Sequence, residues 1–110
     1  MNHIVEIRSL NLKPDTREEF HRLLMEESIP LQKRSNIDVV VHGPSLHDEY
    51  SYYVIRSFDS LTHREQSEDT FYSSDGWRQG PGEAMLTLIE SYTDIVRELD
   101  DVTVQGLRGK

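Results

Sequence analysis

The sequence predicts an α+β fold of the ferredoxin-like type, with the element order βαββαβ and a four-stranded antiparallel sheet. The first observation is an internal repeat: Ile7-Arg8-Ser9-Leu10 returns 48 residues later as Ile55-Arg56-Ser57-Phe58, and an Arg-Glu pair follows each copy. The second is that segments with strand periodicity and segments with helical periodicity alternate in this order. Two related βα halves would place the first and third strands side by side at the centre of the sheet.

The first half begins with a strand over residues 4–12, which ends at a proline-containing turn. Thr16 and Glu19 then form a capping-box pattern, and apolar residues recur with helical spacing as far as Ser35. Pro30 lies late in this helix, and we expect it to kink or restart the last turns, because its ring clashes with the carbonyl four residues earlier.

The remaining elements follow from the same patterns. Gly-Pro and Gly-rich segments mark the turns. They separate runs of β-branched and aromatic residues, which predict strands, from weakly amphipathic segments, which predict helices. The expected elements are a strand over 37–42, a strand over 50–58, a helix over 61–72, a broken helical region around Trp77, and a strand over 91–99. Residues 1–99 would thus form one domain, and residues 100–110 lack a pattern and are expected to fray.

Composition limits the partners and the compartment. Twelve Lys and Arg stand against 20 Asp and Glu, so the net charge of -8 disfavours nucleic acid and anionic membrane surfaces as partners. The chain has no cysteine, which excludes disulfides and thiolate nucleophiles and fits a reducing compartment. No basic region or long apolar stretch stands at the N-terminus, so we expect a cytoplasmic protein.

The repeat places two arginines within strands. Because side chains alternate along a strand, Arg8 and Arg56 occupy matching positions and should point from one face of the sheet, together with Glu6 and Tyr52. The opposite face carries smaller apolar residues, as helix packing requires. We therefore expect the arginine face to have no cover from its own chain, and each guanidinium to need an acidic partner, water or an anionic ligand.

Six short segments carry a family resemblance: Val5-Glu6-Ile7-Arg8, Lys13-Pro14, Arg17-Glu18-Glu19-Phe20, Gly43-Pro44-Ser45, Tyr52-Tyr53-Val54-Ile55-Arg56 and Phe71-Tyr72-Ser73-Ser74-Asp75-Gly76-Trp77. Together they resemble bacterial NIPSNAP-family proteins, which belong to the dimeric α/β-barrel superfamily. The resemblance covers about residues 4–99 and implies a homodimer whose two sheets face each other around a cavity. The superfamily also includes cofactor-independent monooxygenases, muconolactone isomerase and heme-handling enzymes, a likeness at the level of the fold alone.

The candidate site follows from the arginine face. Two guanidiniums that face one cavity can bind a carboxylate through hydrogen bonds or stabilise the oxygen of an enolate. We expect a small apolar or carboxylate-bearing ligand in the cavity between the two sheets, bound by Arg8, Arg56, Glu6, Tyr52, His42 and Trp77. Trp77 is included because it lies between two glycine-containing breaks, where a segment could move over a pocket.

Three readings stay open. The chain is a binding protein, or a cofactor-free monooxygenase or isomerase in which Arg8 and Arg56 stabilise an enolate and His42 or Tyr52 moves the proton. In the third reading the arginines pair with acidic residues such as Glu6 or Asp94 or with the partner subunit, and the protein is structural.

Metal ions, nucleotides and hydrolytic chemistry are not predicted. The five histidines lack the spacing of a metal or heme site, so neither a metal nor a cofactor is expected. The glycines near Trp77 do not follow a strand, and no phosphate-binding Lys-Ser/Thr pair or G-x-S-x-G elbow is present.

Overall fold

A four-stranded antiparallel sheet with helices on both faces makes up the computed structural model, which describes residues 1–109. The strands are β1 (Asn2–Leu12), β2 (Asp38–Pro44), β3 (Ser51–Phe58) and β4 (Ile89–Asp100), in the order β2-β3-β1-β4. The helices are α1 (Arg17–Leu23), the π-helical turn η1 (Leu24–Ser28), α2 (Ile29–Arg34), α3 (Leu61–Tyr72), α4 (Asp75–Arg78), α5 (Gly82–Leu88) and α6 (Asp101–Leu107). The predicted ferredoxin-like α+β fold, with β1 and β3 at its centre, is confirmed.

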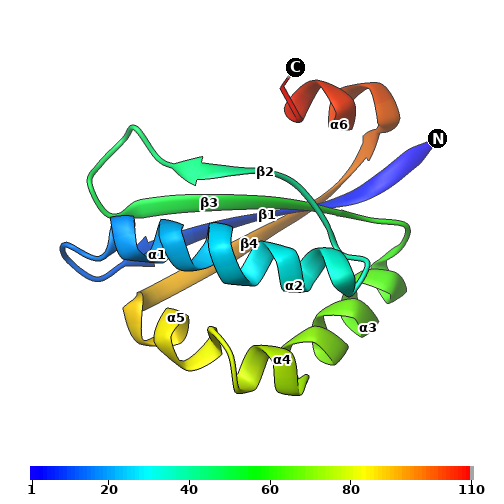
Figure 1. Cartoon of the computed structure of the whole chain (residues 1–110). Coiled ribbons are helices and arrows are strands. Elements are labelled where there is room, and N and C mark those ends of the chain that lie inside the picture. The colour runs from blue at the N-terminus through cyan, green and yellow to red at the C-terminus, as the bar shows by residue number, and fades with distance from the viewer. Residues whose placement is uncertain (110) are drawn as a thin grey trace.

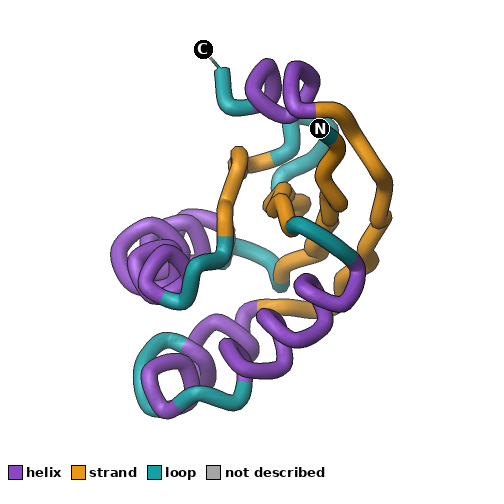
Figure 2. The backbone as a smooth tube through the Cα atoms, turned by 90° about the vertical axis from the view of Figure 1, so that its right-hand side faces the viewer, coloured by secondary structure: helices purple, strands orange, loops and turns teal. Residues whose placement is uncertain are grey.

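Helices α1 to α5 cover one face of the sheet, and α6 lies on the other (Figure 1). Turned by 90°, the molecule shows two separate helical groups on the covered side, one formed by α1 and α2 and the other by α3 to α5 (Figure 2). Residues of both helical groups and of the sheet line a cavity.

The strand register places the charged residues on one face. Glu6 pairs with Arg56 across β1 and β3, and Arg8 pairs with Val54 on β3 and with Asp94 on β4. Directly paired residues point from the same face of an antiparallel sheet. The expectation that Arg8 and Arg56 share a face is therefore confirmed.

This shared face is the one that the helices cover. Leu10, Tyr52 and Phe58 alternate with the charged residues along β1 and β3, and they pack into the main core with helix residues such as Phe20 and Phe71. The expectation that the arginine face lacks a cover from its own chain was wrong. The larger apolar side chains are needed to fill the deep space under the helices, and the guanidiniums tolerate burial there because acidic side chains pair with them.

The opposite face carries a row of aliphatic side chains. Val41, Ile55, Ile7 and Ile95 are consecutive partners across the four strands. Helix α6 covers one end of this face, because Val104 is fully buried against residues of β1 and β2. No helix from residues 1–109 covers the row itself along β4, where Ile95 is 60% exposed.

The C-terminal segment is ordered, which corrects the expected frayed tail. Residues 101–107 form α6, and the Asp100 side chain caps this helix by accepting a hydrogen bond from the Thr103 N–H at 2.8 Å. Seven residues are too few to show a clear helical period in the sequence. Lys110, the last residue of the predicted tail, lies outside the described residues.

The first helical segment is continuous through η1. Pro30 stands in the first turn of α2, where its missing N–H and its ring are accommodated by the wider π turn of η1 that precedes it. At the place where a kink or restart was expected, the helix changes from a π turn to an α-helix. The predicted capping box is absent, because the Thr16 side chain does not cap the helix and instead donates a hydrogen bond to the Lys13 carbonyl at 2.7 Å.

Candidate functional site

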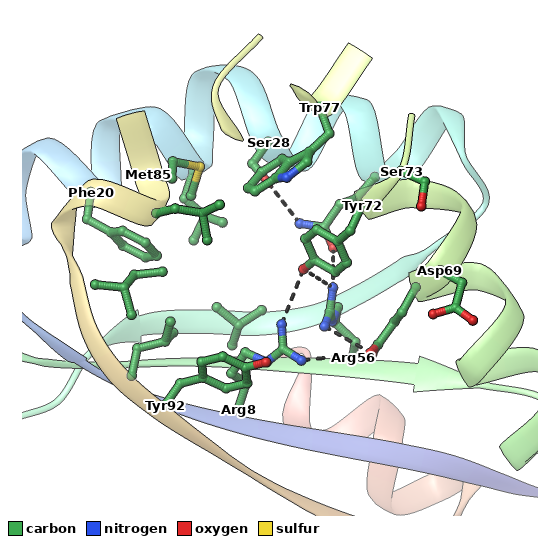
Figure 3. Close-up of a pocket in the computed structure, with 17 residues that line it drawn as sticks. Arg8, Phe20, Ser28, Arg56, Asp69, Tyr72, Ser73, Trp77, Met85 and Tyr92 are labelled. Carbon is green, nitrogen blue, oxygen red and sulfur yellow. Dashed lines mark hydrogen bonds and ion pairs between the residues drawn. The ribbon is translucent and has the colours of Figure 1, made fainter. Parts of the chain in front are cut away.

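A cavity of about 450 Å³ lies between the sheet and the helices of the same chain. Arg8, Arg56 and Tyr72 form its polar end, and the Tyr72 hydroxyl contacts both guanidiniums (Figure 3). The remaining wall is mainly apolar and includes Leu10, Phe20, Leu24, Trp77, Met85 and Ile89. The cavity is therefore intramolecular, which corrects the expectation that the site lies between the sheets of two subunits.

Arg56 is saturated by hydrogen bonds within the protein. Its Nη2 donates to Glu6 Oε1 at 2.6 Å and to Glu68 Oε2 at 3.1 Å, and its Nε donates to Glu6 Oε1 at 3.1 Å. Its Nη1 donates to Gln32 Oε1 at 3.1 Å and to the Tyr72 hydroxyl at 3.0 Å. These five bonds use all five N–H groups of a guanidinium. Arg56 thus organises the cavity and has no N–H left for a ligand.

Arg8 keeps a free donor. Its Nε and Nη2 donate to the two Asp94 carboxylate oxygens at 2.8 and 3.0 Å in a bidentate ion pair, and its Nη1 donates to the Tyr72 hydroxyl at 3.3 Å. The Tyr92 ring stacks on the guanidinium, with 4.5 Å from Cζ to the ring centroid. These bonds use three of its five N–H groups, so one N–H on Nη1 and one on Nη2 have no hydrogen-bond acceptor within residues 1–109, and Arg8, unlike Arg56, can bind a ligand oxygen.

Tyr72 also offers a donor to the cavity. Its hydroxyl oxygen accepts hydrogen bonds from both Arg56 Nη1 and Arg8 Nη1. With two donors on the oxygen, the hydroxyl proton remains available, and the described chain supplies no acceptor for it. The Tyr72 O–H and the Arg8 N–H therefore present two donors at one end of an apolar cavity.

The charged groups around the polar end balance one another. Arg64 of α3 joins the network by donating to Glu6 Oε2 at 2.9 Å and to Asp94 Oδ2 at 3.2 Å. Three positive charges then face three carboxylates: Arg8, Arg56 and Arg64 against Glu6, Glu68 and Asp94. A buried network of this kind is tolerated because each charge has a partner of the opposite sign.

The two glutamates of the network, Glu6 and Glu68, have very different pKa values. Burial alone would raise the pKa of Glu6, but the hydrogen bond with Glu68 and the charges of Arg56 and Arg8 lower this pKa to about 2. Burial and the same hydrogen bond raise the pKa of Glu68 to about 7, against the opposing effect of Arg56. Near neutral pH, Glu6 is therefore ionised and Glu68 exchanges its proton with the solvent.

The helix over the cavity contributes two buried polar residues. Ser28 at the end of η1 accepts a hydrogen bond from Gln32 Nε2 at 3.1 Å, and Gln32 Oε1 in turn accepts from Arg56. Both residues line the cavity. The π turn thus connects the first helical segment to the arginine network, and short π segments often occur at functional sites.

The structure separates the residues predicted for the site. Arg8, Arg56 and Trp77 line the cavity, and Glu6 lies beneath it as the partner of Arg56. Tyr52 and His42 do not join them. The Tyr52 hydroxyl lies 2.6 Å from Nδ1 of His21 and 3.1 Å from Nδ1 of His42, in a separate cluster between α1 and the edge of the sheet. They share the face, but the Tyr52 hydroxyl is bound by His21 of α1 and by His42 of the edge strand β2, and neither histidine lines the cavity.

Sequence reasoning missed Tyr72, Glu68, Gln32 and Ser28. Glu68 and Tyr72 are four residues apart on α3, so they point from the same side of that helix. The sequence signal that could have found them is the weak apolar stripe of α3. A helix that covers a core with few apolar residues must place its polar side chains against other polar groups. The pairing of the arginines with Glu6 and Asp94, one of the alternatives, is observed.

Within residues 1–109 no group of three or more His, Asp or Glu side chains is arranged to hold a metal ion. None of the helices described is both long and apolar enough to cross a membrane.

Fold and site together define an α+β protein of the ferredoxin-like class with a cavity between its sheet and its helices. The NIPSNAP family profile matches residues 5–96, and the chain belongs to this family. A comparison with curated protein sequences finds no match.

Solved structures agree with this assignment. A NIPSNAP family protein with unknown function from Agrobacterium tumefaciens is 20% identical, with a TM-score of 0.80 over 88% of this chain and 87% of the other. An uncharacterised NIPSNAP domain protein from Burkholderia xenovorans is 12% identical, with a TM-score of 0.78 over 89% and 95%. A Caulobacter crescentus protein assigned by name to antibiotic biosynthesis monooxygenases is 17% identical, with a TM-score of 0.64 over 90% and 89%. These likenesses establish the fold.

Proposed function

We propose that the chain binds a small, mainly apolar molecule that carries one carboxylate or carbonyl oxygen. The observation that carries this proposal is the pair of available donors, the Arg8 Nη1 N–H and the Tyr72 O–H, at the end of a mainly apolar cavity. A ligand oxygen at this end would accept both hydrogen bonds, and charge-assisted bonds of this kind are stronger than neutral ones.

The apolar wall supplies the rest of the affinity. Phe20, Leu24 and Met85 are buried core residues that also face the cavity. Each 100 Å² of apolar ligand surface that leaves water contributes about 2.5 kcal/mol. A cavity of about 450 Å³ accommodates a medium-length acyl chain or a small aromatic acid.

Calorimetric titration with octanoate tests the proposal. Arg8→Gln removes the free N–H and one positive charge, while Asp94 keeps its hydrogen bond to Arg64. We expect at least about tenfold weaker octanoate binding, which is the value of one charge-assisted hydrogen bond. Arg22→Gln is the matched control, because Arg22 pairs with Glu19 and Glu26 on the outer surface of α1. Native mass spectrometry of the purified protein would show any ligand retained from the cell.

Two results would contradict this proposal. One is that neither octanoate nor its neutral analogue octanamide binds to the folded protein at millimolar concentration, which would favour the third interpretation, a structural protein without a ligand. The other is that Arg8→Gln and Arg22→Gln bind octanoate equally well, which would show that the ligand oxygen is not bound by Arg8.

The homodimer is part of the same proposal, but on the face opposite the cavity. The aliphatic row of Val41, Ile55, Ile7 and Ile95 is suited to pack against a second copy of itself in a twofold arrangement, sheet on sheet. Light scattering after gel filtration should give twice the mass of one chain, and Ile95→Lys should give monomers that stay folded. A wild-type monomer at all concentrations would contradict this part.

An isomerase or monooxygenase of the cofactor-free kind is the alternative function. The Tyr72 hydroxyl, held by two guanidiniums, is placed to stabilise an enolate oxygen as its charge develops. Glu68 replaces His42 and Tyr52 as the group that could move the proton, because it faces the cavity and they do not. Accelerated exchange of the α-hydrogens of 2-octanone in D₂O would support this function, and unchanged exchange would contradict it.

The cytoplasm remains the proposed compartment, supported by a sequence without cysteine.

A further inference from the structure

The ion-paired network at the polar end of the cavity has no net charge when all six of its side chains are ionised; Asp69, which is exposed, also lines the cavity but is not part of this network. Three arginines and three carboxylates contact one another there, and each side chain of this network is at most 19% exposed. A carboxylate ligand that entered this neutral network would add one unbalanced negative charge in a place with little water. Such a charge is costly unless a proton or a cation enters with it.

Glu68 is the carboxyl group best placed to take up this proton. Glu6 accepts from Arg56 and Arg64 through three hydrogen bonds, and Asp94 is bound by both Arg8 and Arg64. Glu68 receives one guanidinium hydrogen bond, from Arg56 Nη2 at 3.1 Å, and its distances to Arg64 and Arg8 are 3.6 and 3.7 Å.

Glu68 alone among these three carboxyl groups lines the cavity. The charged or titratable side chains around Glu68 come from three elements. They are Glu6 and Arg8 on β1, Arg56 on β3, and Arg64, Asp69 and Tyr72 on α3, the helix of Glu68 itself. Glu6 Oε1 and Glu68 Oε2 accept from the same guanidinium nitrogen, Arg56 Nη2, so one proton between the two carboxyl groups relieves their repulsion. A pKa of Glu68 of about 7 supports this assignment, because that proton is exchangeable near neutral pH.

Resting on the proposed function, we infer that a carboxylate binds in this cavity together with one proton, which Glu68 takes up. The site then accepts the equivalent of a neutral monocarboxylic acid, and binding is linked to pH through one named group. The ligand itself is ionised in solution above pH 6, so any proton that enters the site with it comes from the solvent. Affinity for the carboxylate should fall by about tenfold for each pH unit above the midpoint of Glu68.

Calorimetry of octanoate binding in buffers with different ionisation enthalpies measures this proton directly. At pH 8.5, where unliganded Glu68 is mostly ionised, we expect uptake of about one proton for each octanoate, and at pH 5.5 close to none. Octanamide, which has the same chain without the charge, should bind without proton uptake and with little dependence on pH.

Two variants assign the proton to its residue. Glu68→Gln keeps the size and polarity of the side chain, so it should bind octanoate at pH 8.5 without proton uptake and with an affinity that varies little from pH 6 to 9. Glu65→Gln is the matched control, because Glu65 is an exposed carboxylate on the same helix that does not line the cavity, and it should behave as the wild type.

The outcomes separate the two proposals. Octanoate binding without proton uptake at pH 8.5, or uptake that persists in Glu68→Gln, would overturn this inference and leave the proposed function intact. Failure of octanoate and octanamide alike to bind the folded wild type would overturn the proposed function and this inference with it.

Discussion

Glu6 and Arg56 face each other across the two central strands, and Arg56 Nη2 lies 2.6 Å from Glu6 Oε1. Both side chains are almost completely buried, at 0% and 2% exposure. Such a pair contributes little net stability when it is compared with two apolar residues, yet breaking it leaves a buried charge without a partner. Here the pair also holds the groups that line the cavity in place.

Arg56→Met should therefore lower the free energy of unfolding by about 3–5 kcal/mol, because Glu6, Gln32 and Tyr72 all lose a hydrogen-bond donor. Urea denaturation followed by circular dichroism measures the change. Arg78→Met is the control, since Arg78 is exposed on α4, and we expect a change below about 0.5 kcal/mol. Similar stabilities for the two variants would show that the buried network is not needed for folding.

The sequence predicted the fold well because its information was local. Strand and helix periods, turn residues and the repeat around Arg8 and Arg56 are visible in short segments, and helix α3 was predicted with the bounds that the structure has. The same alternation correctly placed both arginines on one face.

The sequence could not show which face the helices cover. Both faces of β1 and β3 carry apolar residues, so the choice depends on how side-chain volumes fill the space under the helices. Leu10, Tyr52 and Phe58 fill that space, and the arginines between them are buried with their partners. Tyr72 and Glu68 were missed for a related reason, because the contacts of α3 with the sheet join residues far apart in the chain.

Acid should destabilise the protein through Glu6. The folded-state pKa of about 2 lies below the ordinary value of 4.5, so the ionised form is favoured in the folded state. The stabilisation is present above about pH 4.5 and is lost as the pH falls toward 2. Urea denaturation at intervals from pH 6 to 2 should show this decline, and Glu6→Gln should flatten it. An equally steep decline in Glu6→Gln would assign acid sensitivity to other carboxylates.

Glu68 should change the free energy of unfolding with pH in the opposite direction to Glu6. Its folded-state pKa of about 7 lies above the ordinary 4.5, so the protonated form is favoured in the folded state. The stabilisation that this proton gives is complete below about pH 4.5 and is lost as the pH rises through 7. We expect the free energy of unfolding of Glu68→Gln to be less dependent on pH between 5 and 8 than that of the wild type. Carboxyl-carbon NMR of the wild type should show one glutamate that titrates near neutrality, and its absence would refute the assignment.

Gly82 is required by its close contact with Trp77. A Cβ atom at position 82 would lie 2.6 Å from the Trp77 carbonyl oxygen and 2.9 Å from its Nε1, so Gly82→Ala must displace the segment that carries the indole. We expect a loss of about 1–3 kcal/mol in the free energy of unfolding, and a shift in fluorescence from the single tryptophan. Gly106→Ala is the control, because nothing lies within 4 Å of its added Cβ, and in helix α6 it should be neutral or stabilising. Unchanged fluorescence in Gly82→Ala would show that this contact does not hold Trp77 in the cavity wall.

Helix α6 should stabilise the domain through Val104. This side chain is 0% exposed and packs against Val5 and Val40 on the sheet face opposite the cavity. Val104→Ala removes two buried methyl groups and should lower the free energy of unfolding by about 2 kcal/mol, from lost burial and the cavity left behind. Val102→Ala, two residues earlier and 81% exposed, is the matched control and should change it by less than about 0.5 kcal/mol. Equal effects of the two substitutions in urea denaturation would mean that α6 does not dock on the sheet in solution, and that residues 101–107 contribute nothing to the stability of the fold.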